Sequence, residues 1–230
     1  MATTADIIII GGGAAGLMAA AGAATTLAAK AEVSSASGRV IVLEKMPRPG
    51  RKIMITGKGR CNFTNLKQWN EFQEHVHPKP NFLKPSFYNL SSEKMLDFME
   101  QNGLSVVVER GDRAFPESHL ASDVVDALVR AAQSAGAEII CNKEVKDIFA
   151  EADAPKNDSF KIKCQDGSEY TCSKLIICTG GLSYPKTGSS GDGYRWAEEM
   201  AKVLHPGENG MDVFAITNYC REMMDRPLHV

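Results

Sequence analysis

The stretch Asp6–Gly16, D-I-I-I-I-G-G-G-A-A-G, decides the fold that this sequence predicts. Four consecutive isoleucines form a β-branched run with no polar face, which is typical of a strand buried on both sides of a parallel sheet. Three glycines follow directly, and the alanine-rich segment from about Ala14 to Lys30 predicts a helix. A strand, a glycine turn and a helix in this order are the context that gives a G-x-G-x-x-G pattern its meaning.

The glycines of this turn fit the pattern as Gly11-x-Gly13-x-x-Gly16. Gly11 permits the tight turn, Gly13 lets a pyrophosphate approach the backbone, and Gly16 lets the helix pack closely on the strand. The free N–H groups at the helix start, with Ala14 and Ala15, then face the phosphates together with the positive end of the helix dipole. The turn therefore predicts a dinucleotide-binding fold.

The same stretch has an alternative interpretation as a membrane segment. No charged residue occurs from Ile7 to Ala29, and Gly12 and Gly16 form a G-x-x-x-G pair; about 20 apolar residues cross a bilayer. Against this, no Lys or Arg precedes the run, and much of it is Gly, Ala and Thr, which contribute little apolar transfer energy. We expect no membrane partner.

Composition and charge narrow the classes of function. The 230 residues are 43% hydrophobic and 23% charged, as in a globular protein, and the net charge of −2 gives no electrostatic argument for nucleic acid. The cysteines form no C-x-x-C pair, which argues against a zinc site and a dithiol centre. We expect free thiols in a reducing cytoplasm. These cysteines are Cys61, Cys141, Cys164, Cys172, Cys178 and Cys220.

A second buried strand, Arg39–Leu43, ends in an acidic residue, Glu44. A dinucleotide fold uses such a residue to accept hydrogen bonds from the adenosine ribose hydroxyls. Glu44 lies 28 residues beyond Gly16, whereas the usual separation is about 20. We expect the small, polar stretch Ala31–Gly38 to be a loop that makes up the difference; the alternative for Glu44 is an ordinary exposed strand end.

The segment Lys45–Asn65 is rich in glycine and basic residues. It is not a Walker-type loop, because Lys52 stands where the first glycine of G-x-x-x-x-G-K-[ST] belongs and Gly59 follows Lys58. What remains is a basic loop suited to contacting an anion or an electron-rich ring, in which Arg60 or Lys58 could stabilise negative charge. Cys61 beside Arg60 is more simply structural than a thiol of lowered pKa.

Several stretches together resemble the aminoacetone-oxidase-like or BaiN-like group of NAD(P)/FAD-dependent oxidoreductases. They are G-G-G-A-A-G-L-M-A-A, L-E-K, G-R-K-I-M-I-T-G-K-G-R-C-N-F-T-N, the segment 113–128 and C-T-G-G-L-S-Y-P-K-T-G-S-S-G-D-G-Y at 178–194. The resemblance implies an α/β fold: an FAD/NAD(P)-binding, Rossmann-like parallel sheet flanked by helices, with a small antiparallel β-meander insertion. It also implies FAD as the cofactor, with NAD(P) as a candidate electron donor or acceptor.

Further elements are predicted along the chain. Ser91 or Ser92 caps a helix that runs to Gln101, Leu104–Glu109 is a strand, and Ser122 caps a helix over Asp123–Ala135. Ala137–Val145 is the third parallel strand. Asp166-Gly167 marks a hairpin within a meander at about 160–178, before a separate strand at Lys174–Cys178.

The resemblance places Val145 against the adenine and the turn after Cys178 near the flavin; by themselves, the residues would indicate only packing and a plain turn. The predicted cofactor-binding residues are Gly11, Gly13, Ala14, Ala15, Gly16, Glu44, Lys45, Arg51, Lys52, Gly59, Arg60, Cys61, Asn62, Val145, Thr179, Gly180 and Gly181. No catalytic acid, base or nucleophile is legible, and the pair His75 and His77 lacks the further ligands that a metal needs.

The resemblance fades beyond Arg195–Glu199. We expect an FAD-binding domain over residues 1–196 and a divergent tail over 197–230, with the family's substrate domain missing and the chain truncated. The lead function is an FAD-binding oxidoreductase acting on an unidentified small molecule. The alternatives are a non-catalytic dinucleotide-binding fragment and a membrane-anchored protein; the sequence does not determine the oligomeric state.

Overall fold

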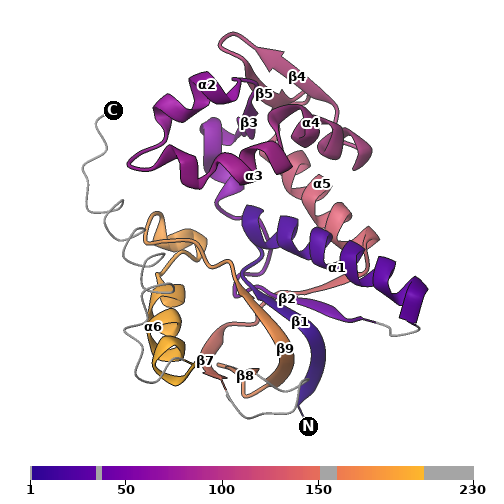
Figure 1. Ribbon diagram of the computed structural model, residues 1–230, viewed down its shortest axis with the longest axis vertical. Helices are drawn as coiled ribbons and strands as arrows, with labels where there is room; N and C mark the ends of the chain where they lie inside the picture. The colour runs from indigo at the N-terminus through magenta and orange to yellow at the C-terminus, as the bar shows by residue number, and fades with distance from the viewer. Residues whose placement is uncertain (1, 35–37, 151–159, 205–230) are drawn as a thin grey trace. The chain divides into compact units, whose positions relative to one another are not determined.

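A computed structural model describes residues 2–34, 38–150 and 160–204 of the chain (Figure 1). The chain divides into two compact units. The first comprises Met1–Arg51 and Ala132–Val230, and the second comprises Lys52–Ala131. The predicted nucleotide fold lies in the first unit.

The first unit is built on a six-stranded sheet in the order β6-β2-β1-β9-β8-β7. The strands β6 (Ala137–Ile140), β2 (Val40–Leu43), β1 (Thr3–Ile10) and β9 (Glu169–Ile177) are parallel. The last two, β8 (Phe160–Cys164) and β7 (Val145–Ala150), add to β9 in antiparallel fashion. A parallel sheet with β1 at its centre and helices against it confirms the predicted Rossmann-type α/β fold.

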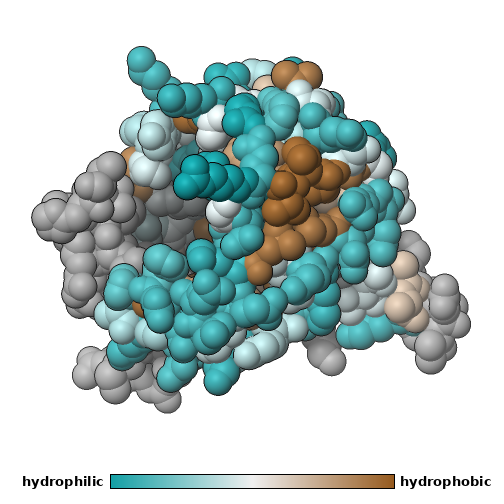
Figure 2. All heavy atoms as spheres, turned by 90° about the horizontal axis from the view of Figure 1, so that it is seen from above, coloured by the Kyte–Doolittle hydropathy of each residue, from teal (hydrophilic) through white to brown (hydrophobic). Residues whose placement is uncertain are grey.

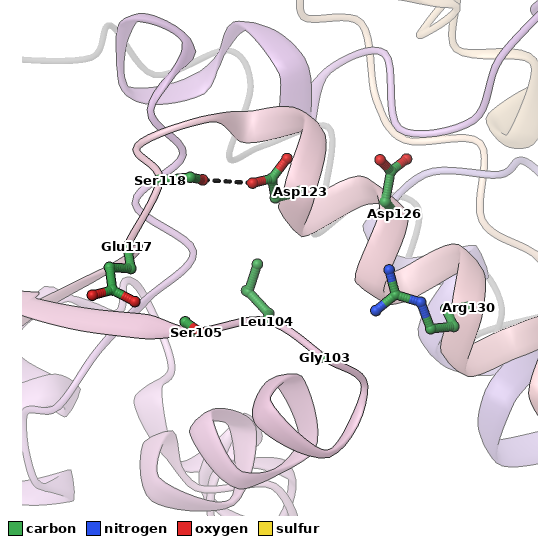
Figure 3. Close-up of a pocket in the computed structure, with 8 residues that line it drawn as sticks. All are labelled: Gly103, Leu104, Ser105, Glu117, Ser118, Asp123, Asp126 and Arg130. Carbon is green, nitrogen blue, oxygen red and sulfur yellow. Dashed lines mark hydrogen bonds between the residues drawn. The ribbon is translucent and has the colours of Figure 1, made fainter.

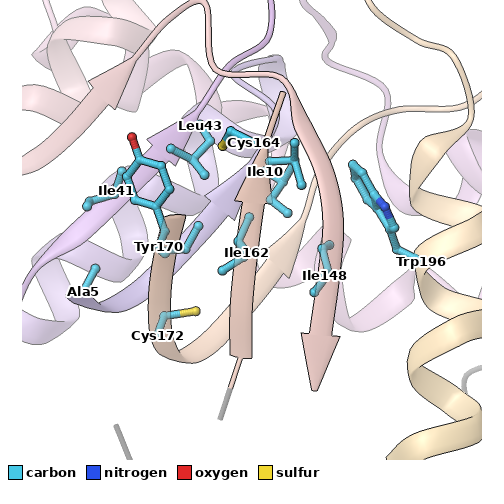
Figure 4. Packing of buried hydrophobic residues seen from close by; sticks show 12 residues of the cluster. Ala5, Ile10, Ile41, Leu43, Ile148, Ile162, Cys164, Tyr170, Cys172 and Trp196 are labelled. Carbon is cyan, nitrogen blue, oxygen red and sulfur yellow. The ribbon is translucent and has the colours of Figure 1, made fainter. Parts of the chain in front are cut away.

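Two hydrophobic clusters cover the two faces of β1. Ile8 and Ile10 pack with side chains from β2, β7 and β8 and with Trp196 of α6 (Asp192–Leu204), as Figure 4 shows. Ile7 and Ile9 pack instead against alanines of α1 (Ala14–Ser34) and valines of β2. Because successive side chains of a strand point to opposite faces, burial on both sides requires the unbroken isoleucine run seen in the sequence.

Three boundaries in the first unit differ from the sequence prediction. The helix α1 continues to Ser34, so residues 31–34 of the expected loop are helical, and 35–37 lie outside the described residues. Val145 does not end the third parallel strand: β6 stops at Ile140, and Val145 begins β7. The expected separate strand at Lys174–Cys178 is the second half of β9. The first half of β9 pairs with β8, and nearly the whole of β9 pairs with β1.

The end of the described chain is helical. A 3-10 turn at Pro185–Thr187 precedes α6, which the sequence analysis did not predict. This helix crosses residue 196, where the sequence placed the end of the nucleotide-binding domain. Residues 205–230 of the predicted tail lie outside the described residues. No helix within the described ranges is long and apolar enough to cross a bilayer.

The second unit holds a three-stranded antiparallel sheet in the order β3-β5-β4. The helix α4 begins after Ser91, whose Oγ accepts the Lys94 N–H, as the sequence predicts. The helix α5 starts at Ala121, so Ser122 lies inside its first turn and is not the cap. The elements are β3 (Thr64–Asn65), β4 (Val106–Glu109), β5 (Arg113–Pro116), α2 (Trp69–Phe72), α3 (Lys84–Asn89), α4 (Ser92–Gln101), α5 (Ala121–Ser134, which enters the first unit) and the 3-10 segments Ile53–Gly59, Gln73–His75 and Pro80–Phe82.

The surface of the second unit carries several exposed apolar side chains, among them Phe82, Tyr88 and Leu120. Phe87 and Tyr88 also belong to an aromatic cluster around the buried Trp69. Figure 2 shows a brown apolar area bordered by polar residues on one face of the molecule.

Candidate functional site

The glycine turn between β1 and α1 is held by close backbone packing. Gly11 has φ +103°, and a Cβ there would lie 2.6 Å from the carbonyl oxygen of Cys178. At Gly16 a Cβ would lie only 1.8 Å from the carbonyl oxygen of Gly11. Both positions therefore require glycine, and the turn brings the start of α1 directly onto the ends of β1 and β9.

Gly13 is different because its surroundings are open. A Cβ at this position would meet no protein atom within 4 Å. The Gly13 carbonyl accepts the first intrahelical hydrogen bond, from Leu17 N at 2.9 Å. The backbone N–H groups that precede Leu17 in the first turn therefore have no intrahelical acceptor. Ala14 and Ala15 in that turn are exposed. This arrangement suits an anionic group approaching the helix start.

Glu44 lies against the glycine turn and is buried, with 8% of its surface exposed. One carboxylate oxygen accepts the Gly12 N–H at 2.6 Å and the other accepts the Met46 N–H at 2.7 Å. These bonds fix the side chain, and each oxygen retains a lone pair for a ribose hydroxyl. The ribose contact remains a prediction, whereas the alternative of an ordinary exposed strand end is wrong.

The loop that follows β2 is tied to the same turn. The Gly50 N–H donates to the Gly12 carbonyl at 2.9 Å, and the Pro49 ring lies beside Gly12. Arg51, a predicted cofactor residue, is exposed directly after this contact. Arg48 is exposed on the same loop. Arg48 was not among the residues predicted from the sequence.

The end of β9 meets the end of β1 at the same edge. The Cys178 N–H donates to the Ile10 carbonyl at 2.8 Å, and Thr179–Gly181 follow. Gly180 is exposed with φ +70°. The structure thus gathers the Gly11–Gly16 turn, Glu44 and the Thr179–Gly181 turn at the carboxyl edge of the parallel strands, where open α/β sheets bind ligands.

Two other predicted residues of this unit have structural partners. Val145 is buried in the hydrophobic cluster of β1 and pairs with Cys164, and the contact of the backbone at this position with the adenine stays a prediction. Lys45, the residue after Glu44, bonds with its Nζ to Ser190 Oγ and to Asp192 Oδ2, the latter at 2.9 Å. The sequence analysis did not anticipate either partner of Lys45.

The remaining predicted residues, Lys52, Gly59, Arg60, Cys61 and Asn62, belong to the second unit. Burial raises the pKa of the Cys61 thiol, although a hydrogen bond with Thr56 lowers it in part. A raised pKa argues against a reactive thiolate and favours the structural interpretation of Cys61. The Asn62 side-chain amide donates to the carbonyls of Thr64 and Ala114, which places it within the sheet packing.

Arg60 is held by three side chains of its own unit. Its guanidinium lies over the ring of Phe115, 4.5 Å from the centroid, and forms an ion pair with Glu109. Its Nη2 is also 3.0 Å from Nδ1 of His119. A cation fixed in this way offers charge in a defined position.

The second unit also contains a cavity of about 510 Å³ that the sequence analysis did not foresee (Figure 3). None of the predicted site residues lines it. In the close-up, Ser118 donates to Asp123, and Arg130 extends from the same helix as Asp126. The lining residues are Gly103, Leu104, Ser105, Glu117, Ser118, Asp123, Asp126 and Arg130. Among the described residues, no group of three or more His, Cys, Asp and Glu could hold a metal ion.

Comparison with known proteins identifies relatives of this arrangement. The chain is 30% identical over 186 residues to the ribosomal RNA dihydrouridine synthase of Escherichia coli K12, covering 81% of this chain and 44% of that protein. It is 29% identical over 179 residues to the 3-dehydro-bile acid delta(4,6)-reductase of Clostridium scindens, covering 78% and 42%. The chain thus spans less than half the length of these relatives.

Solved structures share the fold at low sequence identity. A flavocytochrome c3 fumarate reductase in its open conformation matches with a TM-score of 0.54 at 18% identity, covering 86% of this chain and 40% of that one. The 3-ketosteroid-delta4-(5alpha)-dehydrogenase of Rhodococcus jostii RHA1 matches with a TM-score of 0.56 at 12% identity, covering 79% and 47%. These likenesses support the fold alone.

A family model matches residues 5–224, which is nearly the whole chain. The match extends past residue 196. The family match confirms the resemblance to FAD-dependent oxidoreductases that was found in the sequence, and it supports FAD as the cofactor. The chain belongs to the family described as the HI0933-like protein Rossmann domain.

Proposed function

We propose that this chain is the FAD-binding part of a flavoprotein oxidoreductase. The observation that carries the proposal is the open position at Gly13, where the exposed first turn of α1 adjoins the fixed carboxylate of Glu44. A dinucleotide needs both parts, because its pyrophosphate binds helix amides and its ribose hydroxyls donate to a carboxylate.

The residues of the first unit would divide the binding as follows. The amides of Gly13, Ala14 and Ala15 would hold the pyrophosphate, Glu44 the adenosine ribose, and Arg51 would add positive charge near the phosphates. The flavin would supply hydride chemistry when bound, and the protein would orient it. Thr179–Gly181 would follow the cofactor along the carboxyl edge of the sheet.

For the whole protein we propose a reduction of a carbon–carbon double bond that is conjugated to a carbonyl. One relative is named for making dihydrouridine, which carries two more hydrogens than uridine across such a bond, and another is named a delta(4,6)-reductase. We propose a small molecule as substrate, since the net charge of −2 gives no electrostatic support for RNA. Salt-sensitive binding of ribosomal RNA would overturn that choice.

The proposal is tested by FAD binding to Gly13→Ala. The new methyl group meets no protein atom within 4 Å but would occupy the path of a pyrophosphate. We expect FAD affinity, measured by quenching of flavin fluorescence, to fall roughly tenfold or more. We expect a stability loss of about 1 kcal/mol or less, because alanine is a poorer N-cap than glycine by roughly that amount.

Gly22→Ala is the matched control, because it adds a methyl group to α1 where there is also no atom within 4 Å. It is expected to leave FAD affinity unchanged and to raise stability by about 0.5–1 kcal/mol. Unchanged FAD affinity in Gly13→Ala would place the cofactor elsewhere. A colourless wild-type chain that takes up no added FAD would refute the proposal, and FAD binding without turnover of any enone would favour the non-catalytic alternative.

A further inference from the structure

The ammonium group of Lys45 is enclosed by the segment that leads into α6. Its Nζ donates to Ser190 Oγ and, at 2.9 Å, to Asp192 Oδ2, and Ser190 Oγ in turn donates to Asp192 at 2.7 Å. Gly188 has φ +99°, and a Cβ there would lie 3.3 Å from Lys45 Cε. The side chains of Lys45 and Asp192 are only 23% and 32% exposed. The lysine is therefore held along much of its length.

Lys45 lies at the point where dinucleotide-binding folds contact the adenosine ribose. It directly follows Glu44, at the end of the second strand of the dinucleotide fold. In such folds, a carboxylate at this point binds the free 2′-hydroxyl of adenosine, whereas a cation nearby accommodates a 2′-phosphate. This chain has both residue types side by side, so the sequence alone leaves open which kind of ribose it binds.

The charges around the site favour one of the two. Burial alone would raise the pKa of Asp192, but hydrogen bonds from Ser190 and Lys45 outweigh it and hold that pKa below its usual value. Asp192 is therefore ionised at neutral pH and balances the charge of Lys45. Glu44, whose oxygens accept from the Gly12 and Met46 amides, is not the partner of Lys45 and would therefore be left to accept from the ribose hydroxyls.

We infer that Asp192, together with Ser190, withholds Lys45 from the ribose and so makes this site select an adenosine without a 2′-phosphate. In this inference Asp192 is a specificity-determining residue on a segment 147 positions away in sequence. The inference rests on the proposed function, because it concerns the same adenosine site. It predicts that FAD and unphosphorylated nucleotides bind here and that NADP(H) does not.

The test compares two ligands that differ only in the 2′-phosphate, ADP-ribose and 2′-phospho-ADP-ribose, as competitors for FAD. For the wild type we expect ADP-ribose to bind at least about tenfold more tightly. Asp192→Asn keeps the shape of the side chain but removes its charge, so Lys45 becomes available to the phosphate. For Asp192→Asn we expect the preference for ADP-ribose over 2′-phospho-ADP-ribose to fall by about tenfold relative to the wild type. This fall should be larger at low salt, where charge interactions are screened less.

Three variants separate this role from a general effect on the fold. Lys45→Met combined with Asp192→Asn should abolish the gain, because Lys45 is the cation that the inference assigns to the 2′-phosphate. Asp192→Glu should restore the wild-type ratio. Glu199→Gln removes one negative charge from the same helix, where Glu199 pairs with Arg195, and should leave the ratio unchanged.

The outcomes distinguish the inference from the proposed function. If ADP-ribose displaces FAD but Asp192→Asn keeps the wild-type ratio, the inference is wrong and the FAD site stands. A wild type that binds both ligands equally also overturns the inference. If FAD binds but neither ligand displaces it from any variant, the adenosine site is misplaced and the inference is wrong, whereas a wild type that binds no FAD at all would refute the proposed function.

Discussion

Two glycine-rich segments of this chain use glycine for different physical reasons. In the first unit, Gly11 and Gly16 are surrounded by backbone atoms that would lie 2.6 Å and 1.8 Å from a Cβ. In the second unit, Gly59 has φ +87° and would place a Cβ with no atom within 4 Å. The first segment needs the absence of a side chain for close approach, in addition to the positive φ of Gly11, whereas Gly59 needs only a left-handed backbone.

The distinction predicts how each segment responds to change. A steric conflict with a backbone carbonyl cannot be relieved by rotating a side chain, so it must move a strand or a helix. A left-handed conformation costs about 1–2 kcal/mol for an ordinary residue but leaves the surroundings intact. The second segment in fact contains Lys58 and Cys61 with φ +57° and +56°, which shows that this cost is tolerated there.

The largest effect is expected for Gly16→Ala. Its Cβ would overlap the Gly11 carbonyl oxygen, and α1 can relieve the conflict only by separating from β1. We expect a loss of roughly 3 kcal/mol or more in the free energy of unfolding, measured by urea denaturation. Gly22→Ala serves again as the control on the same helix. A loss of less than about 1 kcal/mol in the free energy of unfolding would mean that Gly16 does not pack directly against the Gly11 carbonyl.

A smaller effect is expected for Gly59→Ala. The methyl group meets nothing, so only the positive φ is penalised, at about 1–2 kcal/mol. The same urea titration measures it, with circular dichroism to show that the helix content is retained. If Gly59→Ala cost as much as Gly16→Ala, close contact would govern both segments and the comparison would fail.

The sequence predicted the first segment well because the information is local. The isoleucine run, the glycine spacing and Glu44 at a strand end are each legible within a few residues, and a parallel sheet brings them to one edge. The Lys45–Asp192 contact could not be found in this way, since its partners are 147 positions apart and the two stretches that contain them, L-E-K and 178–194, do not by themselves show that they meet. The helix α6, in contrast, was legible locally, because its sequence begins with an acidic residue and repeats apolar residues at helical spacing, although the sequence analysis did not predict it.

The second unit was harder to predict because its elements are short and depend on distant pairing. The strand β3 has only two residues, which pair with β5, and the four-residue strand β5 pairs with both β3 and β4. Arg60 was identified as a candidate cation, but its partners Glu109, Phe115 and His119 come from later segments of the chain. The first unit holds one comparable error: Val145 was predicted to end the third parallel strand, because the short loop after Ile140 was taken for more strand.

The smallest effect is expected for Lys58→Gly, and its sign is the opposite of the others. Lys58 is exposed with φ +57°, so glycine relieves the left-handed strain while making the unfolded chain more flexible. The two terms leave a net stabilisation of at most about 1 kcal/mol. Lys58→Ala is the matched control, because it removes the same side chain but keeps a Cβ, and it should give no stabilisation. If both variants stabilised the protein equally, the gain would come from removing the lysine side chain. The left-handed backbone at Lys58 would then not account for the change in stability.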